Sequence, residues 1–222
     1  INLKTNISEV NKKSKFSEVF SKNKDINYLS LGRVFLFGSR DTWFVVGLPI
    51  FLYSALSNGS LDGNKNAFFI IGTFMAAWTI FYGLIQVITP KILSKDISLS
   101  KQIKFWSGFL TAIPLLLISF NYYFEEYSIY NVAFLLFMFG FVFAINSSIH
   151  SFLILNYTNN KRVTLDVGFY YMSNAFGRLI GTLLSGLAFQ YGGFTMCLFI
   201  TSILLLLNRL SIEKLNLKNV ET

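Results

Sequence analysis

The chain has 222 residues, of which 53% are hydrophobic and only 14% are charged. A soluble domain carries about a quarter of charged residues, so this chain lacks the polar surface that a water-soluble core would need, and its excess apolar surface must face lipid. Its single cysteine, Cys197, excludes an intrachain disulfide.

Residues 1–30 are polar and rich in lysine, and we expect them to form a basic linker. Runs of about twenty apolar residues follow, each long enough to cross roughly 30 Å of hydrocarbon as a helix. The runs are continuous rather than alternating and are too long for barrel strands. They predict an all-α membrane protein with a six-helix transmembrane unit over residues 31–210 and a tail over residues 211–222. The six expected spans are residues 31–56, 67–89, 105–123, 130–155, 167–190 and 192–208.

The distribution of basic residues predicts the orientation. Most of the 19 lysine and arginine residues fall in the linker, the loops between spans two and three and between spans four and five, and the tail. These four segments share one face if six helices cross in turn. By the positive-inside rule that face is cytoplasmic, so we expect a multi-pass protein of the cell (inner or plasma) membrane with both termini in the cytoplasm. The net charge of +8 then reflects topology, and no nucleic-acid partner is expected.

Four charged residues lie inside the first and fifth spans. Arg33 is close to the edge of its span and is expected to snorkel to the headgroups as an anchor. Arg40, Asp41 and Arg178 lie deeper, where a charge is expensive and marks a candidate functional site. Arg40 and Asp41 are about 100° apart on a helix, so we expect each to have its own partner. A purely structural alternative is that Arg178 pairs permanently with Asp41 or Asp166 and clamps the bundle.

Two columns of side chains run along the fifth span. Tyr170, Asn174 and Arg178 recur at four-residue spacing with Tyr171 beside them, and such a polar face cannot be left towards lipid. We therefore expect Arg40, Arg178, Asn174 and Tyr171 to bind a substrate in a cavity. Arginine presents a bidentate fork to oxyanions, and two arginines with one carboxylate favour a small anion.

The neighbouring column contains only small residues. It predicts that another helix approaches the fifth span closely along this face. Its members are Ser173, Gly177, Gly181 and Ser185.

Three residues are candidates for ion coupling or for an ion pair. Asp41 is expected to change its protonation or its partner between inward-facing and outward-facing states. His150, near the cytoplasmic end of the fourth span, is either a proton relay or a hydrogen-bonded packing residue. Asp166 opens the fifth helix and is either a coupling group or a carboxylate stabilised by the helix dipole.

Catalytic signatures are lacking from the sequence. We find no nucleophile–base pair, metal-ligand cluster, phosphate-binding glycine loop or Walker motif, and a conventional metal site needs more than one histidine and one cysteine. The sequence therefore predicts no enzyme, cofactor or metal, and favours transport driven by a gradient.

A long basic segment followed by six spans resembles the C-terminal half of a major facilitator superfamily transporter, in which two six-helix halves flank a central substrate site. More closely, residues 35–49 and 166–186 resemble the organoarsenical efflux permeases of the ArsJ type. The first stretch holds the run Arg40-Asp-Thr-Trp-Phe-Val45, and the second holds Gly168-Phe-Tyr-Tyr-Met-Ser-Asn-Ala-Phe-Gly-Arg178. The spans between them match mainly in hydropathy.

This resemblance implies export of 1-arseno-3-phosphoglycerate, which glyceraldehyde-3-phosphate dehydrogenase makes when it uses arsenate in place of phosphate, and hence arsenate resistance. It also implies that the lipid bilayer, the small anionic substrate and a missing N-terminal six-helix half are the partners of this chain. Three alternatives stay open: a carrier of another small organic anion, a non-transporting membrane scaffold subunit, and a self-dimer of the six-helix unit.

Overall fold

The computed structural model describes residues 21, 23–93, 97–124, 128–158 and 162–216. Most of the expected linker and half of the expected tail lie outside this described part. Within it the only regular elements are helices, which confirms the all-α class. They are α1 (Lys24–Phe44), α2 (Gly47–Leu56), α3 (Leu61–Ile92), α4 (Leu99–Tyr123), α5 (Ser128–Tyr157) and α6 (Val163–Glu213).

Five helical segments of the described chain, not six, are long and apolar enough to cross a membrane. Six separate spanning helices were expected, and the count differs because the last two expected spans lie in one 51-residue element, α6, whose helical angles are interrupted at Gly192 and Gly193. The first segment, Lys24–Leu56, combines α1 and α2. These lengths and compositions are compatible with a multi-pass membrane protein.

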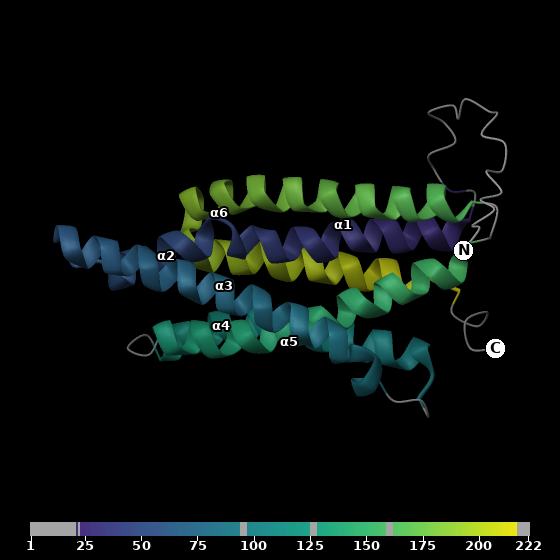
Figure 1. Ribbon diagram of the computed structural model, residues 1–222, viewed down its shortest axis with the longest axis horizontal. Helices are drawn as coiled ribbons and strands as arrows, with labels where there is room; N and C mark the ends of the chain where they lie inside the picture. Colours follow the sequence, from purple (N-terminus) through teal and green to yellow (C-terminus); the bar gives the residue numbers. More distant parts are fainter. Residues whose placement is uncertain (1–20, 22, 94–96, 125–127, 159–161, 217–222) are drawn as a thin grey trace, which may run out of the picture.

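Helix α6 reverses its direction at two glycines. Gly192 has φ −155° and ψ 24°, and Gly193 has φ 60° and ψ −156°, which are not helical values. The positive φ of Gly193 favours a residue without a Cβ. The reversal divides α6 into an N-terminal arm (163–191) and a C-terminal arm (194–213). Figure 1 shows the green N-terminal arm and the yellow C-terminal arm on either side of α1.

Helix α1 begins earlier than the hydropathy predicts. Its first residue is Lys24, and the side chain of Asn23 caps it by accepting a hydrogen bond from the Asp25 backbone N–H at 2.9 Å. The first span was expected to begin at residue 31, so two further turns of helix precede it. This places Arg33 within the third turn of α1 rather than at a helix end.

A break separates α1 from α2. The backbone N–H groups of Val46 and Gly47 donate to the hydroxyl oxygen of Ser185 on α6, at 3.2 and 3.1 Å. A break within an apolar helix frees backbone groups that must find new partners. Ser185 therefore stabilises this break while holding α6 against it.

The predicted close approach along the small-residue column is confirmed. All four members of that column are buried, and the partner is α1. A Cβ added at Gly177 would collide with the backbone of Val34, and one added at Gly181 would collide with the backbone of Gly38. Small residues let two helix backbones come this close, and α1 and α6 form the most extensive helix pair in the bundle.

Aromatic side chains from α1, α3 and α5 fill the centre of the bundle. Trp43 packs edge-on against Phe139 and Trp78, with ring centroids 5.2 and 5.9 Å apart. The indole N–H of Trp78 donates to the Leu136 carbonyl at 2.8 Å. This buried polar atom is therefore satisfied, as a tryptophan in an apolar core requires.

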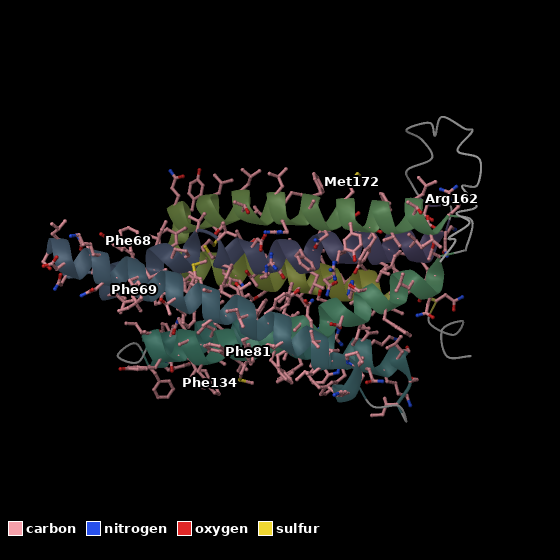
Figure 2. The ribbon with its side chains drawn as sticks, viewed as in Figure 1. Phe68, Phe69, Phe81, Phe134, Arg162 and Met172 are labelled. Carbon is pink, nitrogen blue, oxygen red and sulfur yellow. The ribbon has the colours of Figure 1, made fainter. Side chains whose placement is uncertain are left out.

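The outer surface carries large apolar side chains. Phe68 and Phe69 on α3, Phe134 on α5 and Met172 on α6 are all exposed, and Figure 2 shows them projecting from the bundle. Such a surface suits lipid or another apolar helix rather than water.

Candidate functional site

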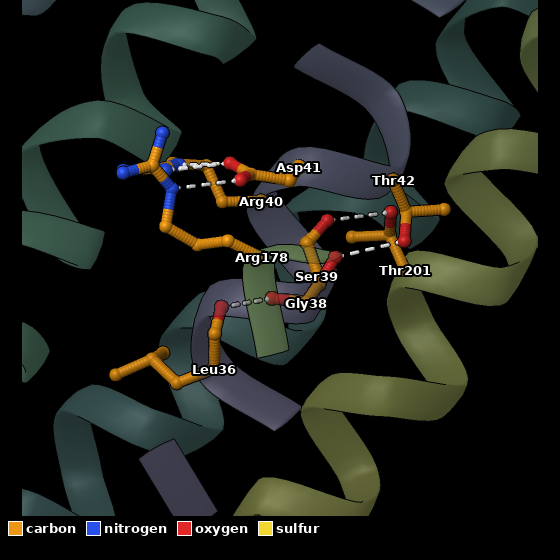
Figure 3. Close-up of polar contacts among 8 residues, drawn as sticks. All are labelled: Leu36, Gly38, Ser39, Arg40, Asp41, Thr42, Arg178 and Thr201. Carbon is orange, nitrogen blue, oxygen red and sulfur yellow. Dashed lines mark hydrogen bonds and ion pairs between the residues drawn. The ribbon is translucent and has the colours of Figure 1, made fainter. Parts of the chain in front are cut away.

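Asp41 is the centre of a three-residue ion-pair cluster that joins α1 to the N-terminal arm of α6. Its Oδ1 accepts from Arg40, with Nε and Nη2 both at 2.6 Å. Its Oδ2 accepts from Arg178 Nε at 3.1 Å. Figure 3 shows the two guanidinium groups converging on this carboxylate. Each oxygen of Asp41 is therefore held by a different arginine.

The pairing of Arg40 with Asp41 differs from our expectation that each would have its own partner. The Cβ atoms of neighbouring helical residues diverge, but the arginine side chain is long enough to turn back to the adjacent carboxylate. The pairing of Arg178 with Asp41 is the one that the structural alternative named. The structure thus brings together three of the seven predicted site residues.

The three members of the cluster differ in exposure. The side chain of Asp41 is 2% exposed and that of Arg40 is 12% exposed, whereas that of Arg178 is 58% exposed. In Figure 3 the two terminal nitrogens of Arg178 point away from Asp41. The cluster carries one excess positive charge, and its unoccupied donors lie on the exposed side.

Short hydrogen bonds fix the turn of α1 that carries the cluster. Ser39 Oγ donates to the Leu36 carbonyl at 2.7 Å, and Thr42 Oγ1 donates to the Gly38 carbonyl at 2.8 Å. Thr201 Oγ1 donates to the Ser39 carbonyl at 3.0 Å from the C-terminal arm of α6. Arg40 and Asp41 therefore sit on a turn that is anchored on the side opposite Arg178.

The other two predicted substrate-binding residues do not bond to the cluster. Tyr171 is exposed, and its ring packs edge-on against Tyr170 with the centroids 5.6 Å apart. The side-chain oxygen of Asn174 is buried and has no hydrogen-bond partner among the described residues. Both lie on the arm of α6 that carries Arg178. Asn174 is one turn before Arg178 and Tyr171 is two turns before it.

Asp166 and His150 lie apart from the cluster. Asp166 is buried in the first turn of α6, where Thr158 Oγ1 donates to its Oδ2 at 3.0 Å and Arg162 Nε lies 3.9 Å from its Oδ1. This local environment is typical of a carboxylate at a helix start. His150 is completely buried on α5, and neither ring nitrogen has a hydrogen-bond partner within the described chain. His150 is therefore buried as a packing residue would be, but the hydrogen bond expected for that role is not observed among the described residues.

Arg33 is the residue that sequence reasoning missed. We expected it to reach the headgroups, but it is 4% exposed. Its Nη1 donates to the carbonyl and the hydroxyl oxygen of Ser147 at 3.1 and 3.0 Å. Its guanidinium carbon lies 4.1 Å from the ring centroid of Phe37 and 4.9 Å from that of Tyr170. The expectation failed because α1 begins at Lys24, which places Arg33 inside the bundle.

Polar residues inside the apolar runs of other spans are the sequence signal that indicates a buried position for Arg33. Ser147 lies within the apolar run of α5, and Gln86 within that of α3. Their side chains hydrogen-bond to each other, from Gln86 Nε2 to Ser147 Oγ at 3.1 Å. Polar groups inside several apolar spans must be satisfied within the protein.

Among the described residues, no group of three or more histidine, cysteine, aspartate or glutamate side chains is placed to hold a metal ion. The arrangement at Asp41 can instead hold an oxyanion through arginine donors, which need no metal.

No family model, curated protein or solved structure matches this chain. The resemblance to the organoarsenical permeases, and with it the major facilitator fold, therefore stays a prediction from the sequence.

Proposed function

We propose that this chain forms half of an alternating-access carrier that exports a small anion. The observation that carries the proposal is the cluster of Arg40, Asp41 and Arg178, in which two arginines share one buried carboxylate inside apolar helices. A spanning segment keeps such charges only at considerable cost. An anionic substrate would balance the excess positive charge each time it binds.

The exposure of Arg178 supports the same proposal. A guanidinium that is 58% exposed within an apolar arm of α6 cannot be left against acyl chains. It requires a water-filled vestibule or another protein surface over it. Its terminal nitrogens can then donate to a phosphate or arsenate group in a charge-assisted manner, while Asn174 and Tyr171 on the same arm supply neutral donors.

Asp41 gives the carrier a way to change state. In the unloaded protein it holds both arginines, and an incoming oxyanion competes with it for Arg178. The exchange of partners alters the link between α1 and α6, which is the kind of two-state element that alternating access needs. We assign Asp41 this switching role, and Asp166 and His150 make no contact with the substrate at this cluster.

The sequence resemblance supplies the finer part of the proposal. It names the substrate as 1-arseno-3-phosphoglycerate and the biological result as arsenate resistance, with glyceraldehyde-3-phosphate dehydrogenase as the upstream enzyme. It also supplies the partner, a second six-helix half that would cover the exposed side of Arg178 and complete the central cavity.

The test replaces Arg178 by glutamine in the full protein. We expect Arg178→Gln to abolish arsenate resistance in cells and substrate flux in vesicles, with normal abundance in the membrane. Arg209→Gln is the matched control, because Arg209 is a half-exposed arginine near the end of the same helix whose ion pair within the described chain is with Glu213, at 3.4 Å. Retained flux in Arg178→Gln would contradict the proposal and reduce Arg178 to a structural clamp.

A membrane scaffold subunit is the second candidate. The saturation of both Asp41 oxygens and the close packing of α1 on α6 favour it, since a permanent clamp needs nothing more. It predicts that vesicles containing the full protein show no substrate-dependent flux. It also predicts that substitutions of Asp41 affect only the stability of the protein.

A further inference from the structure

We propose that Arg33 and Ser147 form a second anion-binding station inside the bundle, separate from the cluster at Asp41. The ligand is a small oxyanion of the phosphate type. The inference deepens the proposed function and rests on it for the nature of the cargo, since an anion carrier needs more than one place for the anion along its path.

The first observation is the lack of a counter-ion. Arg33 forms no ion pair in the described part of the chain, and its Nε is buried without a hydrogen-bond partner. By contrast, Arg40 and Arg178 both share Asp41. Arginine does not release its proton in proteins, so Arg33 remains a cation that is 4% exposed.

Among the described residues, the hydrogen bonds and ring contacts of Arg33 are all with neutral groups. Ser147 accepts two hydrogen bonds from one guanidinium nitrogen, and the rings of Phe37 and Tyr170 lie beside the guanidinium carbon. Hydrogen bonds and aromatic rings reduce the penalty of burying a charge, but they do not cancel the charge. A buried cation with a free donor is suited to an oxyanion.

A second basic group lies close by and also has no acidic partner. His150 follows Ser147 by three residues on α5, so the two side chains occupy neighbouring positions on one face. Its Cε1 lies 3.4 Å, and Asn208 Oδ1 lies 3.2 Å, from the place that a Cβ on Gly32 would occupy. The side-chain nitrogen and oxygen atoms of His150 and Asn208 are buried and unpartnered among the described residues. The region beside Arg33 is thus polar and basic, and its donors are not used up.

A hydrogen-bonded chain connects the station to the half-buried face of α3. Gln86 Nε2 donates to Ser147 Oγ at 3.1 Å and to the hydroxyl oxygen of Tyr82 at 2.7 Å. Gln86 and Tyr82 are only partly buried. An oxyanion arriving at this face can replace Ser147 as the acceptor for Gln86 and reach the guanidinium behind it.

The two stations share one aromatic ring. The guanidinium carbons of Arg33 and Arg40 lie 4.1 and 5.0 Å from the centroid of Phe37. Their separation therefore cannot exceed the sum of these two distances. Because residues 33, 37 and 40 recur on one face of α1, an anion leaving one arginine finds the next along the same helix.

The test measures binding rather than transport, with inorganic phosphate as the probe. The full protein in detergent is titrated with phosphate in a chloride buffer, and both the heat of binding and the unfolding midpoint are followed. We expect Arg33→Gln to weaken the phosphate affinity by about tenfold or more, because a charged donor is lost. Ser147→Ala is expected to weaken it by about threefold, and Arg178→Gln is expected to retain this site.

The unfolding midpoint without phosphate separates binding from a structural role. An uncompensated buried cation is costly to the folded state, so we expect its removal in Arg33→Gln to offset the lost contacts with Ser147 and the rings and to leave the midpoint in chloride at or above that of the parent protein. A large fall in stability for this variant would overturn the inference. Arg33→Lys keeps the charge but loses the Nε donor, and we expect it to fold and bind phosphate about tenfold more weakly. Unchanged affinity in Arg33→Lys would also overturn it.

The outcome for Arg178 keeps this inference distinct from the proposed function. If phosphate binding is lost in Arg178→Gln and retained in Arg33→Gln, the anion binds at Asp41 alone and only the second station is refuted. If phosphate binding depends on Arg33 but substrate flux is absent from vesicles, the station stands and the carrier function is refuted. A parent protein that binds no phosphate refutes the station directly.

Discussion

Arg178 Nε lies 3.1 Å from Asp41 Oδ2, although 137 residues separate the two in the chain. The carboxylate is almost completely buried, and the guanidinium is more than half exposed. This contact joins α1 to the N-terminal arm of α6 close to Gly181, where an added Cβ would collide with the Gly38 backbone. A packed helix pair and an exposed donor are therefore combined at one place.

Asp41→Asn should weaken this junction. Asparagine keeps the volume but removes the charge that both arginines share, so we expect a loss of about 1–3 kcal/mol in the free energy of unfolding. Thermal unfolding in detergent measures it. The double variant Asp41→Asn, Arg178→Gln should lose less than the sum of the single changes, because the two residues are coupled. Strictly additive losses would show that the ion pair contributes nothing.

Gly177→Ala and Gly181→Ala should each destabilise the protein. The added methyl group would meet the backbone of α1, which cannot move aside, and overpacking of this kind costs about 1–3 kcal/mol. Gly186→Ala is the matched control on the same arm, because its Cβ would have open space. We expect that control to be neutral or up to about 1 kcal/mol more stable, as alanine favours helix. Equal effects at all three glycines would contradict the close packing.

Gly193→Ala tests the reversal of α6. The position has φ 60° and ψ −156°, a combination that residues with a Cβ rarely adopt, and we expect a loss of about 1–3 kcal/mol. The methyl group itself would meet no atom within 4 Å, so any loss reflects the backbone alone. Gly72→Ala on α3, which also has open space, is the control. An unchanged unfolding midpoint for Gly193→Ala would argue against a chain reversal there.

Hydropathy and residue spacing predicted much of the fold. The apolar runs located the helices, and the small-residue column identified the face of α6 that packs on another helix. The sequence also placed the end of the fifth span within two residues of Gly192. It also placed helix on both sides of this point, but it did not show the non-helical angles of Gly192 and Gly193, because hydropathy records the length of an apolar run and not the backbone angles that join two runs.

The candidate site was predicted less completely. Charges in apolar runs drew attention to Arg40, Asp41 and Arg178, and the structure brings all three together. The burial of Arg33 was missed because snorkelling was judged from the edge of the apolar run, whereas α1 extends beyond that edge to Lys24. Its partner Ser147 lies 114 residues away, and no local pattern reports such a contact.

The central claim is that Arg178 faces water or a substrate within the membrane, not lipid. Arg178→Cys and Leu183→Cys form a matched pair, since both positions are exposed on the same arm of α6 and lie about 140° apart around the helix. The parent protein supplies the blank, because its single cysteine, Cys197, is buried. In native membranes we expect a charged, membrane-impermeant thiol reagent to label Arg178→Cys readily and to leave Leu183→Cys at the level of the blank. Labelling of Arg178→Cys no faster than the blank would place this position against lipid and contradict the anion-carrier account.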